Sequence, residues 1–431
     1  MRPPAGVTAV LAAALVLAGL GAAGVRAQET VEAPAANGPA LPWPALGASL
    51  RAAFWSDSRD FDGRDNLPVA MLWMHGRWDP HAAISLYLDG RIGNDDLFRA
   101  EATQGKLREA YLDVRGGSLD VRIGRQIIAW GRADQINPTD NLTPRDFTLL
   151  VPEDADQRSG ATGVRATYRF GDLGLTGVLL PTFEPHTIRL QRPPQGSTLR
   201  ERTPGNPVLQ GAVKLEQTGR GLDYSVSYFD GYDLFPDLGI DTVRPDGVDL
   251  LLRHHRIRVV GADAAAALGP YTLRGEAAYT FTEHDRAGDQ IKSPFLFLVL
   301  GADRSLPRGW YVNLQYVLRL VSQYRDPQAV AGFARAVAVE QALINDQLDE
   351  VKHAVALRIA SSWLSETLRA EVSAIVAPAR HEFVVRPKAS YAVTDRLKVT
   401  AGADFFRGDT PSFFGRLRET STAYVELRWD F

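Results

Sequence analysis

Arginine and glutamate recur at alternate positions in several segments of this 431-residue chain. A guanidinium group keeps its positive charge at any physiological pH and presents paired N–H donors that suit carboxylates and phosphates. A wall lined with such groups would attract anionic solutes into a water-filled space. We predict that one face of these segments lines an interior and carries Arg122, Arg165, Arg169, Arg256, Arg258, Arg274, Arg319, Arg358, Arg369, Glu276 and Glu371.

The same charges also have a purely structural interpretation. Arginine and glutamate on neighbouring strands form cross-strand ion pairs, which are ordinary chemistry within a sheet. In that case the side chains would brace a wall and attract no solute. The sequence leaves both interpretations open.

A second charged segment covers residues 127–159, and Pro138, Pro144 and Pro152 stiffen it. An irregular loop longer than about 15 residues is usually functional. Folded inward, this segment would place acidic groups opposite the arginine wall and create a transverse field across a constriction. Folded outward, it would only cap the molecule. We expect the inward arrangement, with a constriction that includes Arg132, Asp134, Asp140, Arg145, Asp146 and Asp154.

Residues 326–346 form another candidate gate. Val330, Phe333, Val337 and Ile344 fall near helical spacing, which predicts a helix within a long loop. Such a helix would either plug a pore or pack on its rim, and packing is the more common role of an apolar stripe.

Signals for catalysis, metal binding and nucleic-acid binding are weak. His254 and His255 are adjacent, so on a strand they point to opposite faces. The segment 60–65 vaguely resembles a calcium loop but lacks the bidentate glutamate at the required spacing. The chain contains no serine-nucleophile elbow and no phosphate-binding loop, and its net charge of −3 includes no basic block. We therefore predict no enzyme, no cofactor and no nucleic-acid partner.

Strands must position the charged residues, because the alternation has a period of two. Across residues 271–281, Tyr271, Leu273 and Phe281 share one face, whereas Arg274 and Glu276 share the other. Such segments are roughly 9–13 residues long, which suits a tilted strand that crosses a bilayer. A soluble sandwich also alternates, so one strand of this kind proves little.

The connections favour a membrane barrel. Short ones, such as Gly116-Gly117 and Leu268-Gly269, alternate with long ones, as in an up-and-down barrel with short periplasmic turns and long extracellular loops. We predict an all-β, transmembrane, antiparallel up-and-down β-barrel over residues 47–431, with about eighteen strands and sixteen as an acceptable count. Either number leaves room inside for water or a ligand.

Both ends of the chain fit export to the outer membrane of a Gram-negative bacterium. Residues 1–27 read as a signal peptide, and residues 28–46 as a proline-rich periplasmic tail. No cysteine is present, so the chain has no disulfide framework. Trp429 and Phe431 end an alternating segment that resembles the terminal aromatic signal recognised by the barrel-assembly machinery.

One stretch carries a family likeness. It resembles a Gly-Arg-Gln, Trp-Gly, Asn-Pro segment found in a large family of Gram-negative outer-membrane barrels of uncharacterised function, and it consists of Gly124, Arg125, Gln126, Trp130, Gly131, Asn137 and Pro138. The resemblance implies partnership with RND-type transporters and periplasmic components that move hydrophobic molecules. Gly-Arg-Gln also occurs at strand ends of carbohydrate porins. In general porins the third loop folds inward, and the segment 127–159 has the same ordinal place.

Three hypotheses for function follow. The first is a porin-like channel in outer-membrane lipid that passes small hydrophilic solutes, anions included. The second is a conduit for hydrophobic or polymeric cargo that acts with an RND-type or periplasmic partner. The third is a barrel enzyme or a purely structural barrel.

Overall fold

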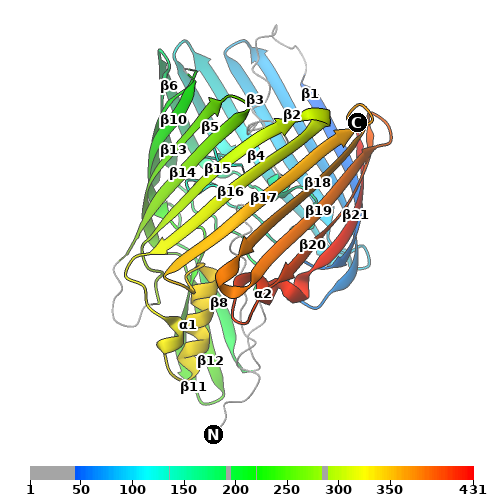
Figure 1. Ribbon diagram of the computed structural model, residues 1–431. Coiled ribbons are helices and arrows are strands. Elements are labelled where there is room, and N and C mark those ends of the chain that lie inside the picture. Colours follow the sequence, from blue (N-terminus) through cyan, green and yellow to red (C-terminus); the bar gives the residue numbers. More distant parts are fainter. Residues whose placement is uncertain (1–43, 135, 191–195, 220, 284–289) are drawn as a thin grey trace.

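Eighteen strands pair edge to edge into one closed antiparallel barrel (Figure 1). The computed structural model describes residues 44–431 apart from 135, 191–195, 220 and 284–289. The predictions of a signal peptide and of most of the periplasmic tail lie outside these residues. The barrel strands are β1 (Ala45–Asp57), β2 (Asp65–His81), β3 (Ile84–Asn94), β4 (Thr103–Gly116), β5 (Leu119–Gln126), β6 (Ala161–Phe170), β7 (Leu173–Leu180), β9 (Gln210–Gln217), β10 (Leu222–Tyr232), β13 (Arg256–Leu268), β14 (Tyr271–Thr282), β15 (Phe295–Leu306), β16 (Trp310–Val321), β17 (Val351–Trp363), β18 (Leu368–Ala377), β19 (Glu382–Ala392), β20 (Leu397–Arg407) and β21 (Thr422–Asp430).

The first and last strands close the barrel. Leu50 of β1 lies opposite Trp429 of β21, and the backbone groups of Ala48 and Phe431 exchange two hydrogen bonds of 2.9 Å. Closure leaves no strand edge unpaired, which is the condition for a sheet to reside in a bilayer. The prediction of an all-β antiparallel barrel with eighteen strands is confirmed.

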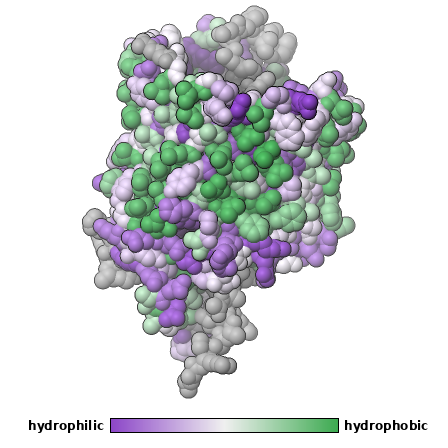
Figure 2. Space-filling view, in the orientation of Figure 1, coloured by the Kyte–Doolittle hydropathy of each residue, from purple (hydrophilic) through white to green (hydrophobic). Residues whose placement is uncertain are grey.

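The outer surface is apolar around the middle of the barrel. On β16, Leu314 and Tyr316 are exposed, whereas Asn313 and Gln315, which alternate with them, are buried. The alternation thus separates an outward from an inward face. Figure 2 shows the resulting hydrophobic belt, with hydrophilic residues above and below it. In the part of the chain that the structure describes, no helix is long and apolar enough to cross a membrane.

Long connections gather at one end of the barrel, which we call the loop end, and short turns at the other, the turn end (Figure 1). The loop end carries a small sheet of β8 (Thr198–Arg202), β11 (Asp237–Arg244) and β12 (Gly247–Arg253). It also carries two helices, α1 (Phe333–Ile344) and α2 (Phe413–Arg416). Helix α1 lies within the predicted segment 326–346, and it packs through Val337, Leu343 and Ile344 into an apolar cluster shared with the barrel wall.

The third loop (residues 127–159) lies inside the loop half of the barrel. Its Trp130 belongs to a cluster with Phe229 and Val259 of the inner wall. Farther along, Val151 packs in a second cluster with Trp55 of β1. Because the loop contacts the wall on several sides, apolar packing fills much of the space that the strand count would leave for water.

A disulfide across the closing seam would test the register of β1 and β21. Ala52 and Leu427 are register partners and both face outward, and the chain has no cysteine of its own. We expect Ala52→Cys with Leu427→Cys to form a reducible cross-link that speeds migration of the denatured chain on a non-reducing gel. The pair Ala52→Cys with Val425→Cys is the control, and efficient cross-linking there instead would contradict the register.

Candidate functional site

Most predicted lining residues do lie on the inward face of their strands. Arg358 of β17, for example, points inward and is only 1% exposed, whereas Val355 and Leu357 of the same strand point outward. Arg169 and Arg369 lie near the turn end, where their side chains are largely exposed. The inward set comprises Arg122, Arg165, Arg169, Arg274, Arg319, Arg358, Arg369, Glu276 and Glu371.

The prediction was wrong for Arg256 and Arg258. In β13 the buried positions are Ile257 and Val259, so the two arginines point outward, where both contact the carboxylate of Asp230. They lie at the loop-end start of their strand. There an outward charge can reach water and pair, because the penalty for charge on the lipid face falls toward the interface.

Most of the inward arginines are paired with carboxylates of the protein itself. Arg122 contacts Asp113 at 3.2 Å, and Arg274 contacts Asp303 at 2.9 Å. Arg319 lies 3.4 Å from the carboxylate of Asp346, next to helix α1. The charge of these arginines is therefore compensated within the wall, as the structural interpretation of the pattern requires.

The third loop supplies several of the remaining partners. Asp134 lies 3.2 Å from Arg358, which also holds Glu371 at 2.7 Å. Asp154 receives a bidentate contact from Arg386 of β19, one bond of which measures 2.9 Å. In these pairs the loop supplies the carboxylate and the wall supplies the arginine, as the sequence predicted.

Two further contacts of the loop lie on other strands. Asp146 lies 3.4 Å from Arg91 of β3. Arg132 contacts Asp263 of β13, so the loop also presents a base to an acid of the wall. Together the contacts tie the loop to strands on widely separated parts of the barrel.

Asp140 does not face the wall. Its carboxylate accepts from Arg145 at 3.0 Å and from Arg158, so these three residues brace the loop internally. Burial by itself would raise the pKa of Asp140, but the two guanidinium groups outweigh it and lower the pKa below its usual value. Burial, together with the neighbouring Arg158, lowers the pKa of Arg145 to about 10.

The carboxylate of Glu276 is the strongest single attachment of the third loop. Glu276 projects inward from β14 and is 1% exposed. It accepts hydrogen bonds from the backbone N–H groups of Arg132 and Ala133 at 3.1 Å and of Thr139 at 2.8 Å. The hydroxyl of Thr139 donates a fourth bond of 2.8 Å. Three backbone donors and one hydroxyl thus converge on one carboxylate, which is a strong, charge-assisted arrangement.

Two glycines of the motif stretch are required by close approach. A Cβ on Gly131 would lie 2.5 Å from the Glu276 carboxylate, and the residue has φ +106°. A Cβ on Gly124 would lie 2.3 Å from the carbonyl oxygen of Ala110, at φ +128°. Both positions therefore exclude larger side chains, the first because the loop folds around Glu276.

The other motif residues anchor the base of the loop. Gln126 is fully buried at the end of β5, and Arg125 contacts Glu184 at 2.7 Å. Trp130 packs inside the barrel rather than in an outer aromatic belt. Asn137 and Pro138 begin a turn in which the Asp140 N–H donates to the Asn137 carbonyl at 3.2 Å.

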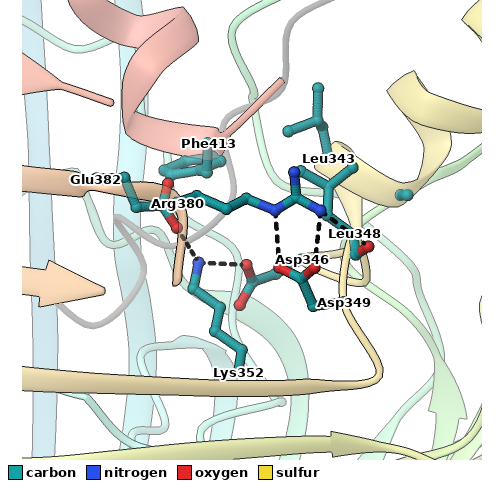
Figure 3. A pocket seen from close by; sticks show the side chains of 9 residues that line it. Leu343, Asp346, Leu348, Asp349, Lys352, Arg380, Glu382 and Phe413 are labelled. Carbon is teal, nitrogen blue, oxygen red and sulfur yellow. Dashed lines mark hydrogen bonds and ion pairs between the residues drawn. The ribbon is translucent and has the colours of Figure 1, made fainter. Parts of the chain in front are cut away.

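A small pocket lies at the loop end, beside helix α1 (Figure 3). Lys352 contacts Asp346 at 2.8 Å and Glu382 at 2.9 Å, and Arg380 reaches Asp349 at 2.7 Å. Sequence reasoning missed this cluster, because Asp346, Asp349 and Lys352 are about thirty residues away from Arg380 and Glu382 along the chain. Within the described ranges, no group of three or more histidine, aspartate and glutamate side chains could hold a metal ion.

Comparisons with known proteins agree with the fold. A family model described as a protein of unknown function, DUF1302, matches residues 39–150, about a quarter of the chain. No curated protein matches this chain. The structure is similar to that of Pseudomonas aeruginosa OccK1 (OpdK), with a TM-score of 0.55 at 10% identity, covering 91% of this chain and 100% of that one.

Two other structures are similar to the same degree. A BenF-like porin from Pseudomonas fluorescens Pf-5 has a TM-score of 0.55 at 9% identity, covering 91% of this chain and 99% of that chain. Pseudomonas aeruginosa OccK5 (OpdH) has a TM-score of 0.54 at 12% identity, covering 91% and 99%. At these identities the likeness shows the fold alone, which is that of outer-membrane porins.

Removing the Glu276 carboxylate should loosen the third loop. Glu276→Ala leaves at least three buried donors without an acceptor, so we expect a loss of roughly 2–4 kcal/mol of stability and faster tryptic cleavage at Arg132 and Arg145. Unfolding temperature and mass spectrometry of the fragments measure both effects. Glu216→Gln is the matched control, since among the described residues this inward glutamate forms ion pairs with the side chains of Lys214 and Arg132 and accepts no backbone N–H of the third loop. Equal protection in both variants would contradict the assignment.

The packing of the loop should also depend on pH. The pKa of Asp140 is lower in the folded protein than in the unfolded chain, so its contribution to stability is complete above about pH 4 and is lost as the pH falls through the lower folded value. We expect thermal stability to fall as the pH drops below about 4, the ordinary pKa of an aspartate, and Asp140→Asn to reduce that dependence. An identical pH profile in the variant would show that other groups govern the acid response.

Proposed function

We propose that this protein is a porin-like channel of the outer membrane of a Gram-negative bacterium, and that small hydrophilic solutes pass through it. The observation that carries the proposal is the third loop inside an eighteen-stranded barrel, held to the inner wall by Glu276 of β14 and Arg386 of β19. A loop in that position narrows the passage and sets an upper limit on solute size.

The two halves of the interior differ in chemistry. Toward the turn end the inward residues include the hydrogen-bonded pairs Thr167 with Thr176 and Ser390 with Thr400. Toward the loop end the inward residues are largely apolar and pack against the third loop. We infer a wet vestibule at the turn end that leads to a constriction near the loop end.

A preference for anions, where present, depends on the balance of paired charges at the constriction. The structure of Pseudomonas aeruginosa OpdK was obtained with vanillate, a small aromatic carboxylate, which supports a small organic solute for a barrel of this fold. In this chain Arg274 pairs with the inward Asp303, whereas Arg122 and Arg115 share the inward Asp113. The second group therefore carries one positive charge in excess, which favours anions beside it.

A specific observation favours a second candidate, a conduit for hydrophobic or polymeric cargo that works with an RND-type or periplasmic partner. Three apolar clusters line the inside of the barrel, and Trp55, Trp73 and Trp130 are among their members. Such surfaces suit a hydrophobic cargo once the loop has moved. In either case we propose that Trp429 and Phe431, exposed at the end of β21, are read by the barrel-assembly machinery.

Planar-bilayer conductance of the purified barrel tests the channel. We expect steady conductance, and a reversal potential in a salt gradient that moves toward cation preference when Arg122→Gln and Arg274→Gln remove two inward positive charges, which leaves Asp303 without its arginine and Asp113 with Arg115 alone. Arg258→Gln, which removes an outward arginine, is the control and should leave the potential unchanged. Silence from the correctly folded wild type would overturn the channel and direct attention to hydrophobic cargo.

A further inference from the structure

Two neighbouring inward amides of β16 have no hydrogen-bond partner. Asn313 and Gln315 are both 0% exposed, and in each side chain neither the nitrogen nor the oxygen is paired. Water cannot reach these four atoms in the arrangement that the structure describes. Buried polar groups are normally satisfied, so a pair of fully unsatisfied amides needs an explanation.

This condition is not general for inward polar side chains. Ser390 and Thr400, on β19 and β20, bond to each other at 3.0 Å. Thr167 and Thr176, on β6 and β7, do the same at 2.9 Å. Ser361 of β17 and Gln126 of β5 each have one buried oxygen without a partner, whereas in Asn313 and Gln315 both polar atoms of the side chain lack one.

The charges beside the amides are already paired. Asn313 lies in register with Asp303 of β15 and Arg358 of β17. Asp303 contacts Arg274 at 2.9 Å, and Arg358 contacts Asp134 and Glu371. Apart from the unpaired Nε of Arg358, the hydrogen-bonding capacity that remains at this place is uncharged and consists of two amide NH2 groups and two carbonyl oxygens.

The third loop covers this part of the wall. Its Asp134 pairs with Arg358, the register partner of Asn313. Its Ala133 and Ile136 belong to the same apolar cluster as Val317 and Ala356. Val317 lies two residues after Gln315 on β16, and Ala356 is the register partner of Gln315 on β17. Gly301 lies opposite Gln315, and the Gln315 side chain packs over it, since a Cβ on Gly301 would lie 3.2 Å from the Gln315 Cγ.

We propose that Asn313 and Gln315 form a binding step for neutral, hydroxyl-bearing solutes, which they engage when Ala133, Asp134 and Ile136 shift off the wall. A hydroxyl group donates and accepts at once, so adjacent hydroxyls satisfy the nitrogen and the oxygen of each amide. A charged solute finds no uncompensated partner at these two residues. The proposal rests on the channel function above and assigns to it a class of solute and a place on the wall.

The test uses the full-length barrel in liposomes with Asn313→Leu and Gln315→Leu combined. Swelling is measured in xylitol, a neutral five-carbon polyol, and in glutarate, a five-carbon anion without hydroxyl groups. We expect the variant to slow xylitol entry by roughly fivefold, the factor that corresponds to the loss of about one hydrogen bond, and to leave glutarate entry unchanged. The melting temperature should not fall, because leucine removes unsatisfied polar atoms at little change in volume.

Ser390→Ala with Thr400→Val is the matched control, because it removes inward polar atoms that are already paired. It should leave the ratio of xylitol to glutarate entry unchanged. Equal slowing of both solutes by the β16 variant, or a lowered melting temperature with an unchanged ratio, would overturn the binding step while leaving the channel intact. Absence of swelling in wild type with either solute would overturn the channel itself.

Discussion

A carboxylate in the middle of the barrel interior organises the arrangement around it. The carboxyl group of Glu276 is almost fully buried and accepts hydrogen bonds from donors of the third loop, so neither the carboxyl group nor these loop donors are satisfied without the other. The loop backbone must turn around the carboxylate, and Gly131 provides the space for that turn. Once the loop is held there, Trp130 on one side and Asp134 on the other meet the parts of the wall that complement them.

The barrel wall shows how a membrane protein can hold many charges without presenting a charged surface. The outward face must be apolar across the bilayer, so charged side chains point into the interior or lie at the ends of strands. In the interior the loop brings a second carboxylate to Arg358 and to Arg386, which already contact Glu371 of β18 and Asp404 of β20. The result is a wall braced by ion pairs, in which both polar atoms of the Asn313 and Gln315 amides are left without a partner.

The packing that holds the third loop in the barrel interior also restricts the passage of solutes. Apolar clusters around Ile136, Trp130 and Val151 stabilise the loop inside the barrel, and the same clusters reduce the space through which a solute could pass. Polar pairs nearer the turn end keep that half compatible with water. The third loop is thus both a structural element and the part of the molecule on which any passage depends.

The sequence by itself determined the barrel, because the constraint is local: each strand must alternate to separate lipid from the interior, and the lengths of the connections repeat along the chain. It also determined the helix within 326–346 and the inward face of residues such as Arg274 and Arg358. It could not determine which charges meet. Asp140 pairs within its own loop, Arg256 and Arg258 face outward beside Asp230, and Glu276 receives donors more than a hundred residues away. The sheet of β8, β11 and β12 was also missed, since its strands lie in loops and pair only with one another. These features were decided by the tertiary structure, because ion pairs and buried hydrogen bonds depend on how the closed barrel and its third loop fit together in space.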